Sequence, residues 1–508
     1  MSEDAMQSHT EMTRRVLWKL DCHILPPLAL LWLANFIDRS NVGNARIAGL
    51  EKDTHLKGNQ FNTVLAVFYV TYLLVELPSN IILKKMKPNR WIPFLVGIWG
   101  VITTLSSLVE SFGGLVAVRI FLGLFEGGLL PGIILYLSTM YKRHELQLRV
   151  GIFYASASLS GAFGGLLATA IIKMNGVGNL AGWRWIFILE GIATVILAFI
   201  AAYFLPESLE NASFFTEEER SFAVNRFRLD DRLTGQFSPQ AQSSSPTRSL
   251  EKGEDDVHLE KADESVPVEQ KEEFEWREVF RGIWEIQVWL TGMAYFGLIV
   301  SLYSYSLFLP TIVSGLGYTG SAAQLHTVPP YVPAAVLTVV VAFLSDRLKW
   351  RGPFILICLP LAIIGYILAI AAENNKTRYI AVFFMAAGVY PSAPSILSIL
   401  PNNSSGHYKR ATTTALQLAV ANAGGFVATF AYTPDQAPKY IRGHTISLAF
   451  VCLAWVLVAL NVLYCLWENK ARKEGRRHDN IMKYHALVEQ GKTKAPIGDR
   501  HPEFLFTL

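Results

Sequence analysis

The chain has 508 residues, of which 51% are hydrophobic and only 17% are charged. An average globular protein carries about 25% charged residues, so this composition excludes an ordinary soluble enzyme, a coiled coil and a nucleic-acid-binding protein. The formal net charge of +4 is also too small to indicate an anionic polymer as a partner.

Twelve apolar segments follow one another along the chain, and most have the length of about 20 residues that crosses a bilayer core. The sequence therefore predicts an all-α membrane protein with twelve transmembrane helices. The first segment follows a polar start and is long enough to span, so it is expected to stay as a helix rather than be removed as a signal peptide. The predicted spans are 22–47, 61–83, 91–110, 114–139, 150–173, 184–205, 285–312, 324–345, 353–372, 379–400, 411–432 and 445–467.

A long polar stretch between the sixth and seventh spans divides the chain into two six-helix halves. Within it, Thr216 and Glu219 have the spacing of a capping box and predict the start of a short amphipathic helix. The acidic segment that follows has few apolar residues and is expected to be disordered. In order, we expect a cytosolic tail at 1–21, a bundle at 22–205, a cytosolic linker at 206–283, a second bundle at 284–467 and a cytosolic tail at 468–508.

Two patterns relate the halves to each other and to the membrane. Lys and Arg gather in the loops on one side, as in the run 470–477, and are nearly missing from the loops on the other, so both termini are expected in the cytoplasm. The Gly-Gly and Ala-Thr pairs of 162–171 recur in 422–431. This duplication predicts two pseudo-symmetric halves, an architecture in which transporters bind substrate between the halves near the midplane.

Charged residues inside the predicted spans are the main candidates for function, because a charge at the bilayer centre costs at least about 2.5 kcal/mol. Arg119 and Glu126 are seven residues apart, or two helical turns, and so share one face of the fourth span. Glycines between and after them allow a neighbouring helix to approach closely. The full set is Asp38, Arg39, Glu76, Arg119 and Glu126, with Glu190 a weaker case nearer the end of its span.

The pattern R-x-x-x-G-x-x-E-G-x-x-x-P-G, which starts at Arg119, resembles the fourth-helix signature of the major facilitator superfamily. After the eighth span, Asp346, Arg347 and Arg351 resemble its cytoplasmic gating loop, although Ala342 stands in place of the first glycine. The matching loop after the second span lacks the Asp-Arg pair. The resemblance implies the two-bundle fold and structural or gating roles for the four charged residues.

Segments along nearly the whole chain, such as NFIDRSNVGNARIAGL and FLPESLENASFFTEEER, resemble the fungal allantoate permease group of the anion:cation symporters. This group also holds transporters of nicotinate, pantothenate and biotin. The resemblance implies proton-coupled uptake of a small organic anion, such as a ureide or vitamin carboxylate, by a monomer in the plasma membrane of a fungal cell. An exporter of an acidic metabolite and a non-transporting nutrient sensor of the same fold remain alternatives.

The resemblance also implies roles for the buried charges. Arg39 is expected to bind the substrate carboxylate, while Asp38 neutralises it in the empty site and takes up a proton. Glu126 matches a second titratable acid, with Arg119 as its expected partner. Each pair also fits a static ion pair that only ties helices together. Glu76 is either a further proton carrier or a buried acid paired with a cytosolic Lys.

The remaining candidates are uncharged. Tyr72 and Asn422 match substrate-binding residues of the relatives, and Tyr303 and Gln417 are placed to point into the cavity, with interhelical hydrogen bonds as the alternative for the second-half residues. The four cysteines form no C-x-x-C pair and fit packing positions, so no metal is expected. No nucleotide-binding or hydrolase motif occurs, so we expect neither an enzyme nor a cofactor, and protons and membrane lipids are the other expected partners.

Overall fold

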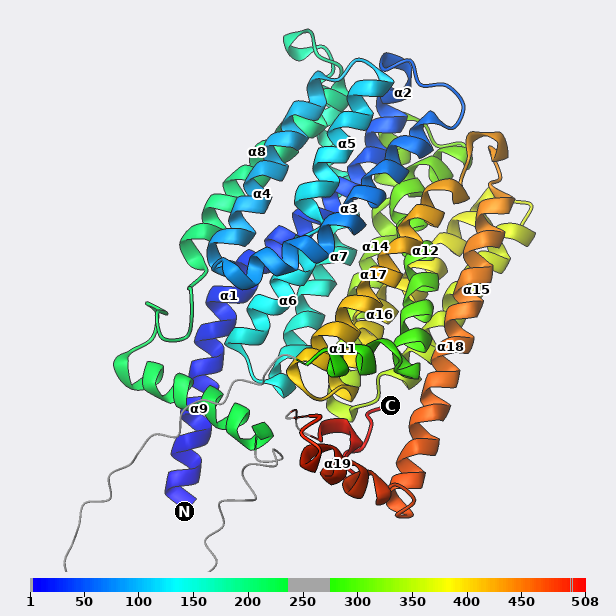
Figure 1. Ribbon diagram of the computed structural model, residues 1–508. Helices are drawn as coiled ribbons and strands as arrows, with labels where there is room; N and C mark the ends of the chain where they lie inside the picture. Colours follow the sequence, from blue (N-terminus) through cyan, green and yellow to red (C-terminus); the bar gives the residue numbers. More distant parts are fainter. Residues whose placement is uncertain (1–2, 236–274, 494, 496) are drawn as a thin grey trace, which may run out of the picture.

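A computed structural model of the chain describes residues 3–235, 275–493, 495 and 497–508. This part of the chain is helical and contains no strand. Two bundles of long helices stand side by side with the seam between them running along the helix axes (Figure 1). The segment 236–274, which holds the acidic stretch expected to be disordered, lies outside the described residues.

The N-terminal bundle contains the six spans predicted for this half. The fourth of them is divided into two helices at Gly127 and Gly128, where residues without a side chain interrupt the helix. The π-helical turn η1 (Arg46–Leu50) and the short α2 (Glu51–Asp53) extend the first span. The long helices are α1 (Glu3–Ala45), α3 (Gln60–Lys85), α4 (Pro88–Leu105), α5 (Phe112–Glu126), α6 (Leu129–Met140), α7 (Arg143–Ile171) and α8 (Gly182–Phe204).

The C-terminal bundle repeats this order and carries shorter helices at its ends. Its six spans are α12 (Ile286–Gly315), α14 (Val328–Leu348), α15 (Gly352–Ala371), α16 (Asn375–Asn403), α17 (His407–Ala431) and α18 (Ile441–Lys473). The shorter helices outside the two bundles or at their ends are α9 (Glu217–Gly235), α11 (Trp276–Ile283), α13 (Gly320–Leu325) and α19 (Asp479–Glu489), with the 3-10 turns η2 (Ser106–Leu108), η3 (Ile172–Met174), η4 (Val177–Asn179), η5 (Pro434–Gln436) and η6 (Gly498–Arg500).

Among the described residues, 10 helices are long and apolar enough to cross a membrane. Two further helices, α3 and α7, contain apolar stretches at Gln60–Glu76 and Ser160–Met174 within their described residues. With these two helices the count matches the twelve predicted spans. At the start of α9 the predicted capping box is confirmed, since Thr216 N donates to Glu219 Oε2 at 3.0 Å and Glu219 N to Thr216 Oγ1 at 3.3 Å.

Glycines bring α3 and α5 into close contact, as the sequence predicts. A Cβ atom on Gly123 would lie 2.5 Å from the carbonyl oxygen of Phe68, and one on Gly127 would lie 2.6 Å from that of Tyr72. In the other half, a Cβ on Gly388 of α16 would lie 2.8 Å from Cys358 O of α15. Small residues thus set the spacing of neighbouring helices in both bundles and place α3 directly against the end of α5 that carries Glu126.

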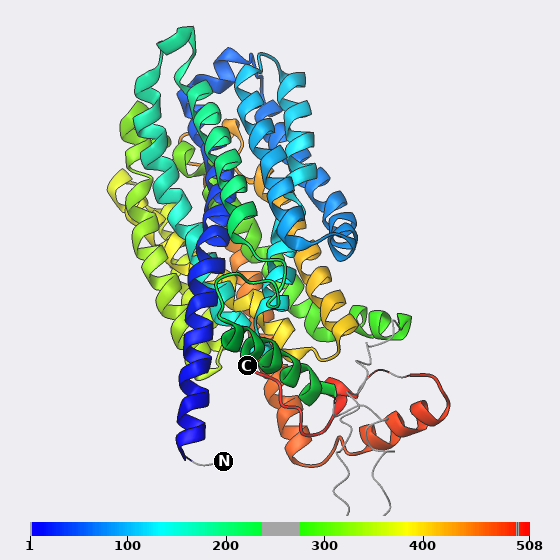
Figure 2. The same cartoon turned by 90° about the vertical axis from the view of Figure 1, so that its left-hand side faces the viewer.

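The two halves meet along α7 and α14, α3 and α17, and α1 and α12. Asn62, near the start of α3, donates from Nδ2 to the carbonyl oxygen of Thr429 at 2.5 Å. Gly165 of α7 packs against Thr327, which precedes α14. These contacts lie toward the end of the molecule opposite the two termini (Figures 1 and 2), so they close the seam on that side.

A layer of polar contacts covers the end of the bundles that carries the termini. Arg226 of α9 forms two hydrogen bonds with Glu145 of α7, at 2.7 and 2.9 Å, and Arg149 pairs with Asp21 of α1 at 2.8 Å. Under the C-terminal half, α19 and the residues after it fold back against the bundle (Figure 2).

Candidate functional site

A buried ion pair joins α1 to α5 in the N-terminal half. Arg39 contacts Glu126 Oε1 through Nε at 2.9 Å and through Nη2 at 2.8 Å. Asn35 donates to the same oxygen at 2.7 Å. Side chains of Arg39 and Glu126 are only 5% and 1% exposed. Oε1 therefore accepts two hydrogen bonds, from Asn35 and from Nε of Arg39, and lies at ion-pair distance from Nη2. Oε2 of Glu126 has no hydrogen-bond partner among the described residues.

Four aromatic rings surround the guanidinium of Arg39. The ring centroids of Phe36, Phe68, Tyr72 and Tyr303 lie 5.6, 5.6, 5.2 and 5.0 Å from its Cζ atom. Rings within about 6 Å attract a cation through their electron-rich faces, which partly replaces the lost hydration. Neither Nη atom of Arg39 donates a hydrogen bond of normal geometry to a described residue. The cage thus stabilises the positive charge without using these donors.

The expected pairing of Asp38 with Arg39 is not formed. Successive helical residues point about 100° apart, and Asp38 instead accepts a hydrogen bond from Trp99 Nε1 of α4 at 2.9 Å. Trp99 is only 1% exposed, so this contact with Asp38 is buried. The carboxylate that pairs with Arg39 is therefore Glu126.

The expected pairing of Arg119 with Glu126 is also not formed. Seven helical residues extend about 10 Å along the axis, so the two side chains share a face without being able to meet easily. Arg119 is buried with 6% of its surface exposed. Glu126 forms its ion pair with Arg39 instead.

Two candidates from opposite halves meet at the seam. Asn422 of α17 donates from Nδ2 to Glu76 Oε2 of α3 at 3.2 Å, and both side chains are buried. Among the described side chains Glu76 forms no ion pair, so the expected cytosolic Lys partner is replaced by a neutral amide. A Cβ atom on Gly425, one turn further along α17, would collide with the ring of Tyr69. The small residue allows the two helices to come this close.

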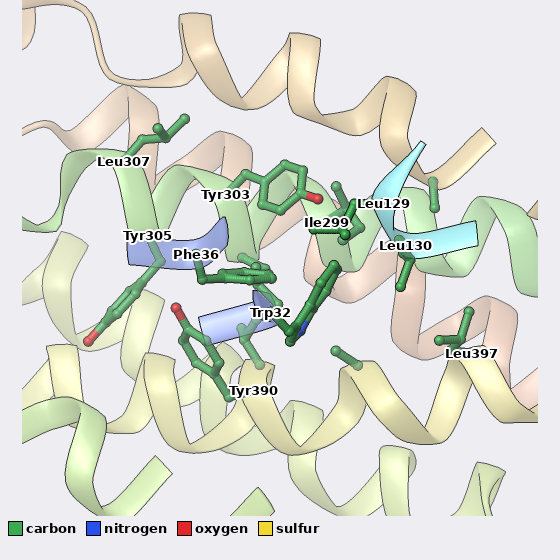
Figure 3. Close-up of a cluster of buried hydrophobic side chains, with 14 of the residues drawn as sticks. Trp32, Phe36, Leu129, Leu130, Ile299, Tyr303, Tyr305, Leu307, Tyr390 and Leu397 are labelled. Atoms are coloured by element: carbon green, nitrogen blue, oxygen red, sulfur yellow. The ribbon is translucent and has the colours of Figure 1, made fainter. Parts of the chain in front are cut away.

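Next to the Arg39 cage lies a narrow cavity of about 20 Å³. Its walls come from α1, α6, α12, α16 and α17, so both halves contribute. Figure 3 shows Trp32 and Phe36 between Tyr303 on one side and Tyr390 on the other. The lining residues are Trp32, Phe36, Leu130, Tyr295, Ile299, Leu302, Tyr303, Tyr390, Ala393 and Asn422. The cavity is therefore mostly aromatic and apolar, with an amide at one edge.

The structure separates the predicted substrate contacts into three groups. Tyr303 and Asn422 line the cavity, and Tyr303 also stacks on Tyr69 with ring centroids 5.4 Å apart. Tyr72 lies behind the cavity as part of the cage. Gln417 donates to Ile396 O at 3.1 Å, which is the interhelical hydrogen bond that the sequence left open as its alternative.

Sequence reasoning did not single out the other cavity aromatics, Trp32, Tyr295 and Tyr390. Aromatic residues are frequent in apolar spans. Whether one of them lines a cavity or packs in the core depends on how its helix is rotated against the neighbouring helices. A weak signal exists in α1, where Trp32, Phe36 and Arg39 recur at helical spacing on one face.

Three of the four residues with predicted structural or gating roles, Asp346, Arg347 and Arg351, lie at the end of the molecule that carries the termini. Arg347 is exposed, whereas Arg351 is buried and contacts the end of the chain. Arg351 N donates to Leu508 O at 2.6 Å, and Nη1 donates to Thr507 Oγ1 at 3.0 Å. Burial lowers the pKa of Arg351 to about 10, although Asp346 nearby favours its charged form. Arg351 therefore anchors the C-terminal segment.

Comparison with known proteins gives consistent matches. A model described as Major Facilitator Superfamily matches residues 28–429. A high-affinity nicotinic acid transporter of Saccharomyces cerevisiae is 30% identical over 97% of this chain and 85% of its own length. An uncharacterized transporter of Schizosaccharomyces pombe is 37% identical over 90% of this chain and 85% of its own.

Solved structures with the same arrangement of helices are far more distant in sequence. The proton:xylose symporter XylE matches with a TM-score of 0.61 at 14% identity, over 86% of this chain and 96% of that one. A bacterial homolog of the human lysosomal transporter Spinster matches with a TM-score of 0.60 at 16% identity, over 87% and 96%. These likenesses concern the fold, which has twelve spans in two halves.

Proposed function

We propose that this chain, which belongs to the Major Facilitator Superfamily and is a membrane transporter rather than an enzyme, takes up a small aromatic carboxylate together with protons. The observation that carries this proposal is the environment of the Arg39 guanidinium. A guanidinium lies at the seam of the two halves, caged by aromatic rings and paired with a single carboxylate oxygen. Its Nη atoms retain donors for a further ligand.

The charge balance at Arg39 favours exchange of one carboxylate for another. An arginine remains charged at all physiological pH values, and its planar fork fits a carboxylate through two parallel hydrogen bonds. In the empty site Glu126 supplies the negative charge. When Glu126 takes up a proton, its hold on the guanidinium weakens and the carboxylate of a substrate can replace it. Proton binding and anion binding then support each other.

The body of the substrate follows from the cavity wall. Five of the ten lining residues are aromatic, namely Trp32, Phe36, Tyr295, Tyr303 and Tyr390. Flat aromatic ligands pack on such rings in offset or edge-to-face geometry, whereas a polar ureide would leave several of its hydrogen-bonding groups unpaired. The similarity to a nicotinic acid transporter supports the same class of substrate, and nicotinate is therefore the first compound to test.

Transport requires the seam to open alternately on its two sides. The contacts of Asn62 with Thr429 and of Asn422 with Glu76 link the halves, so they must break when the side away from the termini opens. We place both termini in the cytoplasm of a fungal cell and the helices in its plasma membrane. The cavity would then receive substrate from outside when these contacts separate.

An uptake assay tests this proposal. Radiolabelled nicotinate, benzoate, an aliphatic monocarboxylate and allantoate are offered at acidic and at neutral external pH to yeast cells that lack their own uptake of each compound. We expect saturable uptake of the aromatic acids that rises with acidity and stops when the proton gradient is dissipated. Efflux from preloaded cells without uptake would instead identify an exporter.

Substitutions at Arg39 connect that assay to the site. The variant R39A should lose uptake while R442A, which removes an exposed arginine at the end of the bundle away from the cavity, should retain it. Surface labelling of both variants shows whether each reaches the membrane. Normal uptake by R39A at normal surface amount contradicts the anion-binding role.

A further inference from the structure

The short helix α11 carries an aromatic stripe on its outer face. Trp276, Phe280 and Trp284 are 66%, 55% and 82% exposed. They are spaced four residues apart, so their side chains follow one another along one side of the helix and its C-terminal end. A contiguous exposed apolar surface of this kind marks a contact with a partner or with a membrane.

The charged residues of the same helix face inward. The side chains of Glu278 and Arg281 are only 8% and 11% exposed, and Arg281 Nη1 donates to Glu278 Oε2 at 2.7 Å. Arg281 also pairs with Asp499 of the C-terminal tail. A surface helix in water has the opposite arrangement, with its apolar stripe on the core and its charges outside. The inversion indicates that the outer face of α11 does not meet bulk water.

Contacts with the C-terminal half fix the direction in which the aromatic stripe points. Gly282 packs against the start of α17, where its Cβ would lie 3.3 Å from side-chain atoms of Thr412 and Thr413. Thr493, in the segment after α19, donates from Oγ1 to Glu275 Oε2 at 2.9 Å. Rotation of the helix to bury the stripe would break these contacts together with the ion pairs of Arg281.

The aromatic stripe continues into the outer surface of a membrane span. Ile286, Trp289 and Met293 of α12 are exposed and lie three and four residues apart on one face of that helix. Trp289 Nε1 donates to Ile283 O of α11 at 2.9 Å, which joins the two helices. Figure 1 shows α11 lying across the ends of the spans rather than along them. The stripe therefore starts where the lipid-facing surface of α12 ends.

We propose that Trp276, Phe280 and Trp284 dock into the lipid bilayer at its interface on the side of the termini, so that α11 is a membrane-surface anchor of the C-terminal half. Tryptophan favours this boundary, because its ring is apolar and its N–H group can reach water. An amphipathic helix at the interface lies in the membrane plane with its apolar face turned to the acyl chains. Residues 236–274, which precede α11, are mostly polar and charged in composition and offer little apolar surface to cover three aromatic rings.

The anchor is separate from the transport cavity. The residues that line the cavity come from α1, α6, α12, α16 and α17, and α11 contributes none of them. The lipid contact therefore does not depend on which substrate is carried or on how protons are coupled to it. A failed uptake assay would leave this inference standing, and a failed anchor would leave the proposed substrate standing.

The depth of a spin label in the bilayer tests the anchor. Cys22 is exposed and Cys452 partly exposed, so both are replaced by serine, while the two buried cysteines are kept. F280C and W284C are made one at a time in this full-length chain, labelled with a nitroxide and reconstituted into phosphatidylcholine vesicles. Collisions with oxygen, which concentrates in lipid, are compared with collisions with a water-soluble nickel chelate.

M482C is the matched control. Met482 of α19 is 67% exposed, and Figure 1 shows α19 farther from the spans than α11. Labels at 280 and 284 should collide with oxygen and lose most of the access to nickel that the label at 482 has. Equal access to nickel at all three positions would overturn the lipid contact.

Two further observations keep the result decisive. Broadening between labels that disappears on dilution with unlabelled chain would identify a second copy on the aromatic stripe and would also overturn the proposal. W284F avoids cysteine and keeps an aromatic ring, so it serves if the labelled variants do not reconstitute. Brominated phosphatidylcholine should quench a larger part of the tryptophan fluorescence in the wild type than in W284F, and equal quenching would contradict the anchor.

Discussion

Substitutions in the ion pair of Arg39 with Glu126 allow a loss of stability to be distinguished from a loss of transport. R39A leaves a buried carboxylate without its cation, and breaking a buried pair in this way costs about 3–5 kcal/mol. In the double variant R39A/E126Q the uncompensated charge is gone, and the amide oxygen can still accept from Asn35, which is 2.7 Å away in the parent. Most of the lost stability should therefore return, while uptake stays absent.

A lysine at the same position isolates the guanidinium fork. R39K keeps the positive charge near Glu126 but offers a substrate carboxylate a point charge in place of two parallel donors. One hydrogen bond to a charged group contributes about 1.5–3 kcal/mol, which corresponds to an increase in KM of about 10- to 150-fold. The maximal rate should fall less than the apparent affinity, because the charge that drives exchange with Glu126 remains.

Stability is measured by thermal unfolding of the detergent-solubilised variants, with size-exclusion chromatography as the readout. The KM is measured from uptake of labelled substrate. R442A serves as the matched control for both. The reasoning is refuted when the double variant is no more stable than R39A, because the charge of Glu126 would then not be the cause of the loss. It is equally refuted by a wild-type KM in R39K.

Three further substitutions test the packing, the seam and the tail. G123A should destabilise the protein by about 1–3 kcal/mol because its Cβ meets the backbone of α3, whereas G97A in α4, where the nearest contact is 3.8 Å, should be neutral in the same unfolding assay. N62L removes a hydrogen bond across the seam and, in a chain that also carries A393C in the cavity wall, should increase labelling of the new thiol from the side away from the termini; unchanged labelling would count against that seam. Although burial opposes its ionisation, the pKa of Asp499 is held below the usual value by Lys409 and Arg281. The docked tail should therefore resist proteolysis at neutral and mildly acidic pH and lose protection only as the pH falls through that lowered pKa, whereas D499N should be cut at every pH.

The fold could be predicted from the sequence because each span is recognised by its own apolar segment and by the charged residues in the loops beside it. The sequence located α3 and α7 as well as the other helices that form the two bundles. It did not anticipate the break in the fourth span at Gly127 and Gly128. A glycine pair is compatible with a continuous helix as well as with a broken one. Which of these forms depends on how closely the neighbouring helices pack.

The partners of the site residues were harder to predict than the residues themselves. Asp38 and Arg39 were assigned to each other because they are adjacent, yet adjacent helical residues face different neighbours, and the structure gives them Trp99 and Glu126. For Glu76 the sequence left open a proton carrier or an acid paired with a cytosolic lysine, and its contact in the structure is Asn422 of the other half. Such contacts depend on how whole helices are rotated and docked, which no spacing along one helix determines.

The arrangement around Arg39 also explains why binding and opening can be coupled. Phe36, Phe68 and Tyr72 belong to the N-terminal half, whereas Tyr303 belongs to the C-terminal half and has the shortest ring distance, 5.0 Å. When the halves separate, the guanidinium of Arg39 loses contact with the ring of Tyr303 and becomes hydrated. Its ion pair with Glu126 then weakens, and its N–H groups become accessible to a ligand. In the proposed cycle an anion replaces Glu126, the halves close again, and the ring returns over a neutralised charge. The affinity for the anion therefore depends on the same contact that holds the seam together.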